Sequence, residues 1–242
     1  MNLFLNLLGL SAFVFGLRSW RLVYRRGWRK VLPVFSLYIL FYCLSTVPVF
    51  LLRVHSLAHP EQRIACLIYQ YTNWAVYLIS ILFLIMVLYE LLLHTIPNQG
   101  NIRRRSLALF ASGTLVFAAI GILVFRSCFD VPNCSMLDHF LCLAGNAGNL
   151  AICGLTGLLI VFKEVFGVPW GRSVWLIVLA PVMYYALAIT GFFLVLIRPN
   201  WSQPFDVAII LSEFIWLVLW WLAVRKAPSA SGTQPTAAAV LI

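Results

Sequence analysis

The sequence predicts an all-helical (all-α), polytopic integral membrane protein: a bundle of seven transmembrane helices with the N-terminus outside and the C-terminus in the cytoplasm. Hydrophobic residues make up 63% of the 242 residues and charged residues only 10%, whereas soluble domains are about one quarter charged. Seven apolar stretches also reach or approach the length of about 20 residues that a helix needs to cross a bilayer. A third observation, the distribution of basic residues, gives the orientation.

The seven stretches account for most of the chain. We expect spans at Asn2–Tyr24, Val31–Leu52, Ile64–Leu93, Leu107–Phe125, Met136–Phe162, Val174–Ile197 and Phe205–Val224. The gaps between them are shorter than the roughly 50 residues of a small independent fold. Residues 1–226 therefore form one seven-helix transmembrane domain. The remaining residues, 227–242, are rich in Ala, Ser, Pro and Thr, and we expect them to be a disordered cytoplasmic tail.

Basic residues are retained on the cytoplasmic side of membrane segments. Under seven spans, thirteen basic residues fall on one side: Arg18, Arg21, Arg25, Arg26, Arg29, Lys30, Arg103, Arg104, Arg105, Lys163, Arg172, Arg225 and Lys226. Four fall on the other: Arg53, Arg63, Arg126 and Arg198. This asymmetry places the N-terminus outside and the C-terminus inside. It also accounts for the net charge of +10 without nucleic-acid binding, so we expect the lipid bilayer and no nucleic acid among the partners.

The first span fits a bilayer only marginally. It has no basic residue before it and a dense basic run after it, the reverse of the order in a cleaved signal peptide. We therefore expect it to remain as an outside-to-inside anchor. Arg18 and Arg21 must then extend towards the lipid surface or lie on a part of the helix that projects into the cytoplasm.

Three spans that run from outside to inside carry polar stripes, because residues three and four apart share one helix face. The third span has Cys66, Gln70, Asn73, Tyr77 and Ser80 on such a face. The fifth has a similar stripe, and the seventh adds a carboxylate near its centre. The sixth span offers a compatible face. The candidate ligand- or proton-binding residues are Gln70, Asn73, Tyr77, Asn146, Asn149, Tyr184 and Glu213.

These stripes have two interpretations. Small and amide side chains can serve only to pack helices and bond them together. Alternatively, the stripes face a polar cavity that is open to the outside and binds a small molecule or ion. Glu213 favours the second interpretation, because a carboxylate at mid-depth is costly and by default marks function. We expect it to be neutral at least part of the time and to bond a Tyr, Asn or Ser on a neighbouring helix.

Two further pairs of residues have alternative interpretations. Cys128 and Cys134 share an outer loop, and the turn at Pro132-Asn133 can bring them together, so a disulfide and two unpaired thiols both fit. Glu90 and His94 lie on one face at the inner end of the third span. We expect an interfacial pair there, and no metal site or cofactor.

Known seven-span classes and enzyme motifs find little support. A retinal protein needs a lysine in its last span, but Lys30, Lys163 and Lys226 all lie outside the spans. The chain has no H-E-x-x-H, G-x-S-x-G or P-loop motif, and we expect no enzyme.

The sequence favours a ligand- or ion-sensing module that signals to a cytoplasmic or membrane protein partner through its basic loops. The first alternative is a transporter for a small solute or a proton-coupled carrier, and the second is a structural membrane subunit. We expect the protein in a cell membrane. Only three of its 17 basic residues are lysines, and from this balance we favour a bacterial inner membrane.

Overall fold

The computed structural model describes residues 2–59, 62–97, 99–126, 135–198 and 202–226, and all the regular secondary-structure elements there are helices. The all-helical prediction is thus confirmed. The helices are α1 (Asn2–Arg25), α2 (Trp28–Val31), α3 (Pro33–Ala58), α4 (Arg63–Thr95), α5 (Gly100–Val124), α6 (Met136–Val165), α7 (Arg172–Ile197) and α8 (Ser202–Val224). Every expected span corresponds to one long helix, and α2 is an additional single turn.

Six helices in the described part of the chain, α3 to α8, are long and apolar enough to cross a membrane. They are compatible with a multi-pass membrane protein. The first helix, α1, is not among the six, so the predicted count of seven spans is not confirmed. Its C-terminal half carries Arg18, Arg21 and Arg25, the residues that made this span the weakest of the seven in the sequence.

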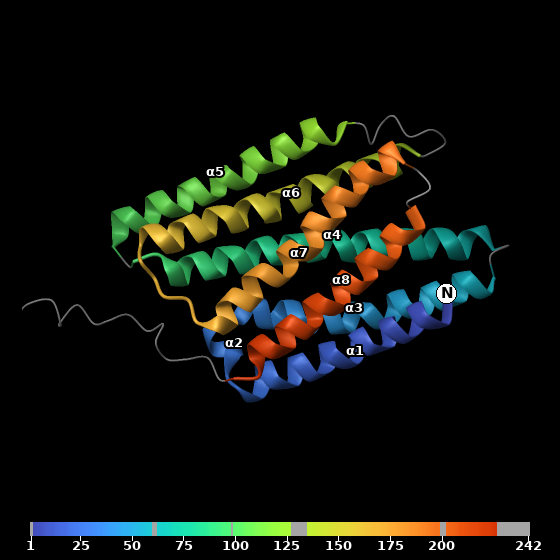
Figure 1. Cartoon of the computed structure of the whole chain (residues 1–242), viewed down its shortest axis with the longest axis horizontal. Coiled ribbons are helices and arrows are strands. Elements are labelled where there is room, and N and C mark those ends of the chain that lie inside the picture. Colours follow the sequence, from blue (N-terminus) through green and yellow to red (C-terminus); the bar gives the residue numbers. More distant parts are fainter. Residues whose placement is uncertain (1, 60–61, 98, 127–134, 199–201, 227–242) are drawn as a thin grey trace, which may run out of the picture.

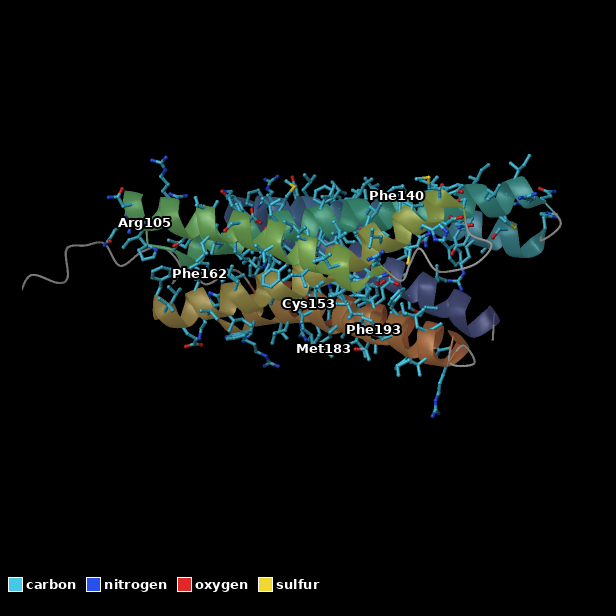
Figure 2. All side chains as sticks on the ribbon, turned by 90° about the horizontal axis from the view of Figure 1, so that it is seen from above. Arg105, Phe140, Cys153, Phe162, Met183 and Phe193 are labelled. Carbon is cyan, nitrogen blue, oxygen red and sulfur yellow. The ribbon has the colours of Figure 1, made fainter. Side chains whose placement is uncertain are left out.

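The long helices alternate in direction along the bundle (Figure 1). One end, here called the basic end, holds the end of α1 and the junctions α4–α5 and α6–α7. Figure 2 shows the same arrangement after a 90° turn: Arg105 and Phe162 lie towards one end, whereas Phe140 and Phe193 lie towards the other. The basic end therefore contains Arg25, Arg26, Arg29, Lys30, Arg103, Arg104, Arg105, Lys163, Arg172, Arg225 and Lys226.

Six of the long helices close into a ring. Each packs against the next in the order α1, α3, α4, α6, α7, α8, and α8 packs against α1 again. Helix α5 lies outside this ring, against α6 and to a smaller extent α4. Its contact with α6 is close: a Cβ on Gly121 would lie 2.6 Å from the Cα of Ala147. Small residues at such positions let helix backbones approach one another.

The N-terminus of α3 is capped by a side chain from another helix. Leu32 precedes the helix and offers no capping side chain, so the first amides of α3 need another acceptor. Glu90 of α4 provides it: its two carboxyl oxygens accept hydrogen bonds from the backbone N–H groups of Val34 and Phe35, at 2.9 and 3.0 Å. The negative charge also suits the positive end of the helix dipole. Glu90 thus joins α3 to α4 at the basic end.

Two tryptophans make further connections at this end. The Trp28 indole of α2 donates to the backbone carbonyl of Lys226, just after α8, at 2.9 Å. The Trp170 indole, between α6 and α7, donates to the hydroxyl of Thr95 at the end of α4, at 3.3 Å. Together with Glu90, these bonds connect segments from five parts of the chain. The basic end is therefore closed by specific hydrogen bonds as well as by packing.

Candidate functional site

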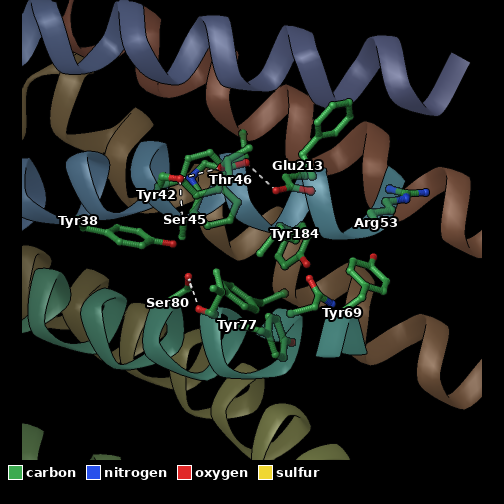
Figure 3. A pocket seen from close by; sticks show the side chains of 16 residues that line it. Tyr38, Tyr42, Ser45, Thr46, Arg53, Tyr69, Tyr77, Ser80, Tyr184 and Glu213 are labelled. Atoms are coloured by element: carbon green, nitrogen blue, oxygen red, sulfur yellow. Dashed lines mark hydrogen bonds between the residues drawn. The ribbon is translucent and has the colours of Figure 1, made fainter. Parts of the chain in front are cut away.

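A cavity of about 230 Å³ lies inside the ring, between α3, α4, α7 and α8. Figure 3 shows side chains from these helices converging on it, with Arg53 towards one end and Tyr38 towards the other. Hydroxyl groups and aromatic rings dominate its walls. The lining residues are Tyr38, Tyr42, Ser45, Thr46, Val49, Phe50, Arg53, Tyr69, Asn73, Val76, Tyr77, Ser80, Tyr184, Tyr185, Glu213 and Trp216.

The cavity extends from the end opposite the basic end to the middle of the bundle. Tyr69 and Asn73 come from the first third of α4, which starts at that opposite end. Glu213 lies halfway along α8. From Arg53 to Tyr38, the lining of α3 covers about 22 Å at a rise of about 1.5 Å per residue. The part closest to the basic end is the floor made by Tyr38, Ser80 and Trp216.

Glu213 and Tyr42 join two helices that are not neighbours in the ring. The hydroxyl of Tyr42 on α3 donates a hydrogen bond of 2.6 Å to Oε1 of Glu213 on α8. Among the residues that the structure describes, Tyr42 supplies the one hydrogen bond to this carboxyl group. We predicted from the sequence a bond from a Tyr, Asn or Ser on a neighbouring helix; the partner is a tyrosine, on a helix across the ring. The second carboxyl oxygen, Oε2, is left available within the cavity.

The floor of the cavity holds two polar groups that lack a hydrogen-bond partner within the described part of the chain: the hydroxyl of Tyr38 and the indole N–H of Trp216. These side chains are 0% and 4% exposed. The hydroxyls of Ser80 and Tyr185 lie near that of Tyr38 without completing a hydrogen bond to it. An unsatisfied buried donor costs about 1–3 kcal/mol, so an acceptor that packed against the floor would gain hydrogen bonds.

Beneath the floor, aromatic rings close the cavity towards the basic end. Trp220 packs edge-to-face against Phe35, Tyr38 and Trp216, with ring centroids at 5.2, 5.3 and 4.8 Å. All four rings are buried. Edge-to-face pairs are favourable arrangements of aromatic rings. This aromatic cluster (Phe35, Tyr38, Trp216, Trp220) separates the cavity from the basic end.

One positive charge faces the cavity near its other end. Arg53 lies five residues before the end of α3 and lines the cavity wall. Its guanidinium is close enough to attract the carboxylate of Glu213, although the two do not form a salt bridge among the described residues. The cavity thus carries one group of each charge, with the cation nearer its mouth.

Four of the seven residues predicted to bind a ligand or proton line this cavity: Asn73, Tyr77, Tyr184 and Glu213. Whether they bind a ligand stays a prediction. The other three lie outside the lining. Gln70 donates to Asp138 at 2.9 Å, and Asn146 donates to the carbonyl of Cys142 on its own helix at 3.0 Å. Asn149 accepts a bond of 2.6 Å from the hydroxyl of Tyr77.

These three positions explain why α6 does not reach the cavity. Asp138 also closes a capping box with Ser135 at the start of α6, so Gln70 ties α4 to the cap of α6. Asn149 is 1% exposed and accepts the hydrogen bond of the Tyr77 hydroxyl. The Tyr77 side chain itself lines the cavity. Within the predicted polar stripe of α6, Asn149 therefore bonds α4, Asn146 bonds its own helix, and neither lines the pocket.

Sequence reasoning missed the contribution of α3, which supplies Tyr38, Tyr42, Ser45, Thr46 and Arg53 to the lining. A signal was present. Tyr38, Tyr42 and Ser45 are spaced by four and three residues, the spacing of one helix face. Because tyrosine is grouped with the hydrophobic residues, this stripe of hydroxyl-bearing side chains resembles an ordinary membrane span.

The remaining predicted contacts have mixed outcomes. Cys128 and Cys134 lie outside the described residues, so the disulfide is untested. His94 contacts the backbone carbonyl of Glu90 through Nδ1, at 2.9 Å, while the Glu90 carboxylate caps α3. Over the described ranges, no group of three or more His, Cys, Asp and Glu side chains is placed to hold a metal ion.

Comparisons with known proteins give no relative. No protein-family model, no curated protein and no solved structure is similar to this chain. The fold and the cavity define the class as a helical protein with six apolar helices compatible with a multi-pass membrane protein.

Proposed function

We propose that this chain is a seven-span sensor of the cell membrane that binds a small molecule from outside and passes its state to a partner at the basic end. The observation that carries the proposal is the cavity around Glu213. A carboxyl group at mid-depth in a membrane helix is expensive and usually functional. Here the carboxyl group of Glu213 accepts a hydrogen bond from Tyr42. It lies about one turn from the Tyr38 hydroxyl and the Trp216 indole, two donors without a partner among the described residues.

The seventh span in this proposal is α1. It packs against both α3 and α8 and completes the ring, and Ser19 and Val23 on it are buried. A helix that closes the ring along its length is best placed in the bilayer with its neighbours.

Exposed apolar side chains on the outside of the bundle, such as Leu115 and Leu123 of α5 at 73% and 75%, are suited to lipid contact.

The orientation follows from the charge distribution. The basic end gathers the great majority of lysines and arginines, and the positive-inside rule assigns that end to the cytoplasm. The cavity then faces the extracytoplasmic side, where Arg53, Tyr69 and Asn73 form its outer wall. A bacterial inner membrane remains the location that we favour.

The closed basic end favours a sensor over a carrier. Glu90 holds the start of α3 through two amides, Trp28 holds the end of α8, and the aromatic cluster lies between them and the cavity. A ligand that moves α3 relative to α8 would act on these connections and so on the basic surface beside them. The partner would meet that surface at the start of α5, which carries Arg103 to Arg105, and at Lys226 just after α8.

A proton-coupled or small-solute carrier is the second candidate, because Glu213 also suits a proton carrier at mid-depth. Purified protein in liposomes separates the two. Ligand binding without flux supports the sensor, whereas substrate-dependent flux that is lost in Glu213→Gln supports the carrier. If Glu213→Gln and Asn149→Leu change stability alone and no ligand binds, the chain is a structural subunit.

The test of the proposal is a ligand screen on the purified chain in lipid nanodiscs, read by thermal unfolding. A ligand bound at 100 times its Kd raises stability by about 2.7 kcal/mol, which is readily detected. We expect hits whose effect is lost in Glu213→Gln and kept in Ser212→Ala, since Ser212 neighbours Glu213 but bonds the carbonyl of Ile209 on its own helix. Hits that ignore Glu213 contradict the assignment of the cavity.

A further inference from the structure

The unsatisfied donors on the cavity floor restrict the chemistry of the ligand. An indole N–H such as that of Trp216 can only donate a hydrogen bond, and the hydroxyl of Tyr38 also has no acceptor. Their rings lie together, with centroids 6.4 Å apart. Water can serve such groups in an unliganded site, so a ligand that displaces it must bring its own acceptor. The end of the ligand that reaches the floor is therefore an oxygen acceptor.

One helical turn further from the basic end, at the level of Glu213, the ligand needs a hydrogen-bond donor instead of an acceptor. Glu213 precedes Trp216 by three residues on α8, and Tyr42 follows Tyr38 by four residues on α3, so each pair shares a helix face. The axial offset is about 5 Å. At this level, the carboxyl group of Glu213 has one hydrogen bond from Tyr42 and a second oxygen to offer. The ligand therefore needs a donor, and preferably a cationic one, about one turn above its acceptor.

Charge balance narrows the ligand further. Glu213 and Arg53 both line the cavity, so an ionised Glu213 leaves the wall with no net charge. Placing a net charge in such a site costs free energy, because charges are poorly solvated there. A ligand that carries one positive and one negative group avoids this cost. Aromatic rings next to Glu213, those of Tyr42, Tyr184 and Trp216, also favour a cationic group at that level.

We propose that the cavity binds a small zwitterion of the amino-acid class, with its ammonium group on Glu213 and its carboxylate on the Tyr38 hydroxyl and the Trp216 indole. This assignment rests on the proposed sensing function and names its ligand. The cavity volume of about 230 Å³ lies below the roughly 300–1,000 Å³ of typical ligand pockets, so it suits a single amino acid and excludes peptides. Tyr184 and Tyr77 then face the side chain of the ligand.

The test uses a matched set of probes on the full chain in lipid nanodiscs. Leucine, leucinol, isoamylamine and isocaproate share the isobutyl side chain, but only leucine carries both charges. The series is repeated on the alanine skeleton, so that side-chain size does not decide the result. We expect the amino acid to bind and the amino alcohol to bind at least about tenfold more weakly. The amine and the carboxylate alone should not bind at the same concentration.

Variants separate ligand contact from a merely structural role. Tyr38→Phe removes an unsatisfied donor at almost constant volume, so it should leave the melting temperature of the unliganded protein unchanged or higher while weakening amino-acid binding about tenfold. Trp216→Phe also removes buried ring contacts, so it should lower the melting temperature as well as weaken binding. Glu213→Gln should abolish the preference for leucine over isocaproate. Ser212→Ala is the control on α8 and should bind like the original chain. Tyr38→Phe and Trp216→Phe proteins that bind the amino acid as tightly as the original overturn the assignment of the floor.

The outcomes distinguish this inference from the function on which it rests. If the amine alone or the amino alcohol binds as tightly as the amino acid, the carboxylate is not recognised and the inference is wrong, while a Glu213-dependent sensor stands. If a broad panel yields Glu213-dependent ligands of another class, the same conclusion follows. If no compound from either panel binds, both the ligand class and the proposed sensing function are overturned.

Discussion

Tyr42 on α3 and Glu213 on α8 share a 2.6 Å hydrogen bond across the interior of the bundle, although α3 and α8 are separated in the ring by α1. The bond therefore joins α3 to α8 at the level of the cavity, in addition to the ring contacts of the aromatic cluster beneath it. It also divides the cavity into an outer part, towards Arg53, and a floor. Changes at this pair should affect the stability and the binding properties of the protein together.

The first prediction concerns the coupling of this pair. Tyr42→Phe leaves an acceptor without its partner and should lower the free energy of unfolding by about 1–3 kcal/mol. In the double variant with Glu213→Gln, the coupling energy should be about 0.5–2 kcal/mol, because bonds between membrane helices are of that order. Reversible unfolding in mixed detergent and denaturant micelles gives all four values. Strictly additive effects would show that the hydrogen bond contributes nothing.

The second prediction concerns the cap that Glu90 places on α3. Glu90→Ala removes the acceptor of one buried and one partly buried amide and should cost about 1.5–3 kcal/mol, the value for bonds to charged groups. Glu90→Gln keeps one acceptor and should cost less. Glu164→Ala is the matched control at the same end, since that carboxylate is 67% exposed and surface ion pairs contribute about 0–1 kcal/mol. Equal losses for Glu90→Ala and Glu164→Ala would refute the cap.

The third prediction concerns Asn149, which holds the Tyr77 hydroxyl from α6. Asn149→Leu leaves that hydroxyl unpaired and should destabilise the protein by about 1–3 kcal/mol. Adding Tyr77→Phe removes the unpaired group, so the double variant should be no less stable than Asn149→Leu alone. The same unfolding assay measures this. A double variant that loses the sum of two single losses would mean that the pair does not act as a unit.

The fourth prediction concerns the close approach of α5 and α6. A Cβ at position 121 would lie 2.6 Å from the Cα of Ala147, so Gly121→Ala should cost about 1–3 kcal/mol through overpacking. Gly157→Ala on α6 meets nothing within 4 Å and should be neutral or stabilising by up to about 1 kcal/mol, because alanine favours the helix. The opposite order of stability would rule out this packing of α5.

The sequence predicted the long helices well because hydrophobic length is a strong signal in membrane helices. The expected Met136–Phe162 and Val174–Ile197 became Met136–Val165 and Arg172–Ile197. The larger differences are at polar ends: α5 begins at Gly100 and includes Arg103 to Arg105. Hydropathy marks where a helix is apolar, whereas the backbone hydrogen bonds continue past that point into the charged turns.

The site was predicted in part. Glu213, Asn73 and Tyr77 stood out because polar residues are rare in apolar spans, and each lines the cavity. The role of α3 was missed because Tyr38 and Tyr42 read as aromatic packing residues. The Glu90 cap was beyond sequence reasoning, since its two partners are backbone amides 55 and 56 residues away. Backbone groups leave no pattern in a sequence.

We expect a water-accessible cavity that opens to the extracytoplasmic side. Ser45→Cys, on the cavity wall in a background without other cysteines, tests it by reaction with a membrane-impermeant thiol reagent on intact cells. Two controls should stay unlabelled: Ser36→Cys, buried on the same helix outside the lining, and Leu82→Cys, exposed at 61% on the outer surface of α4. We expect Ser45→Cys to be labelled from outside, and labelling that occurs only when the reagent reaches the cytoplasmic side, or not at all, contradicts the account.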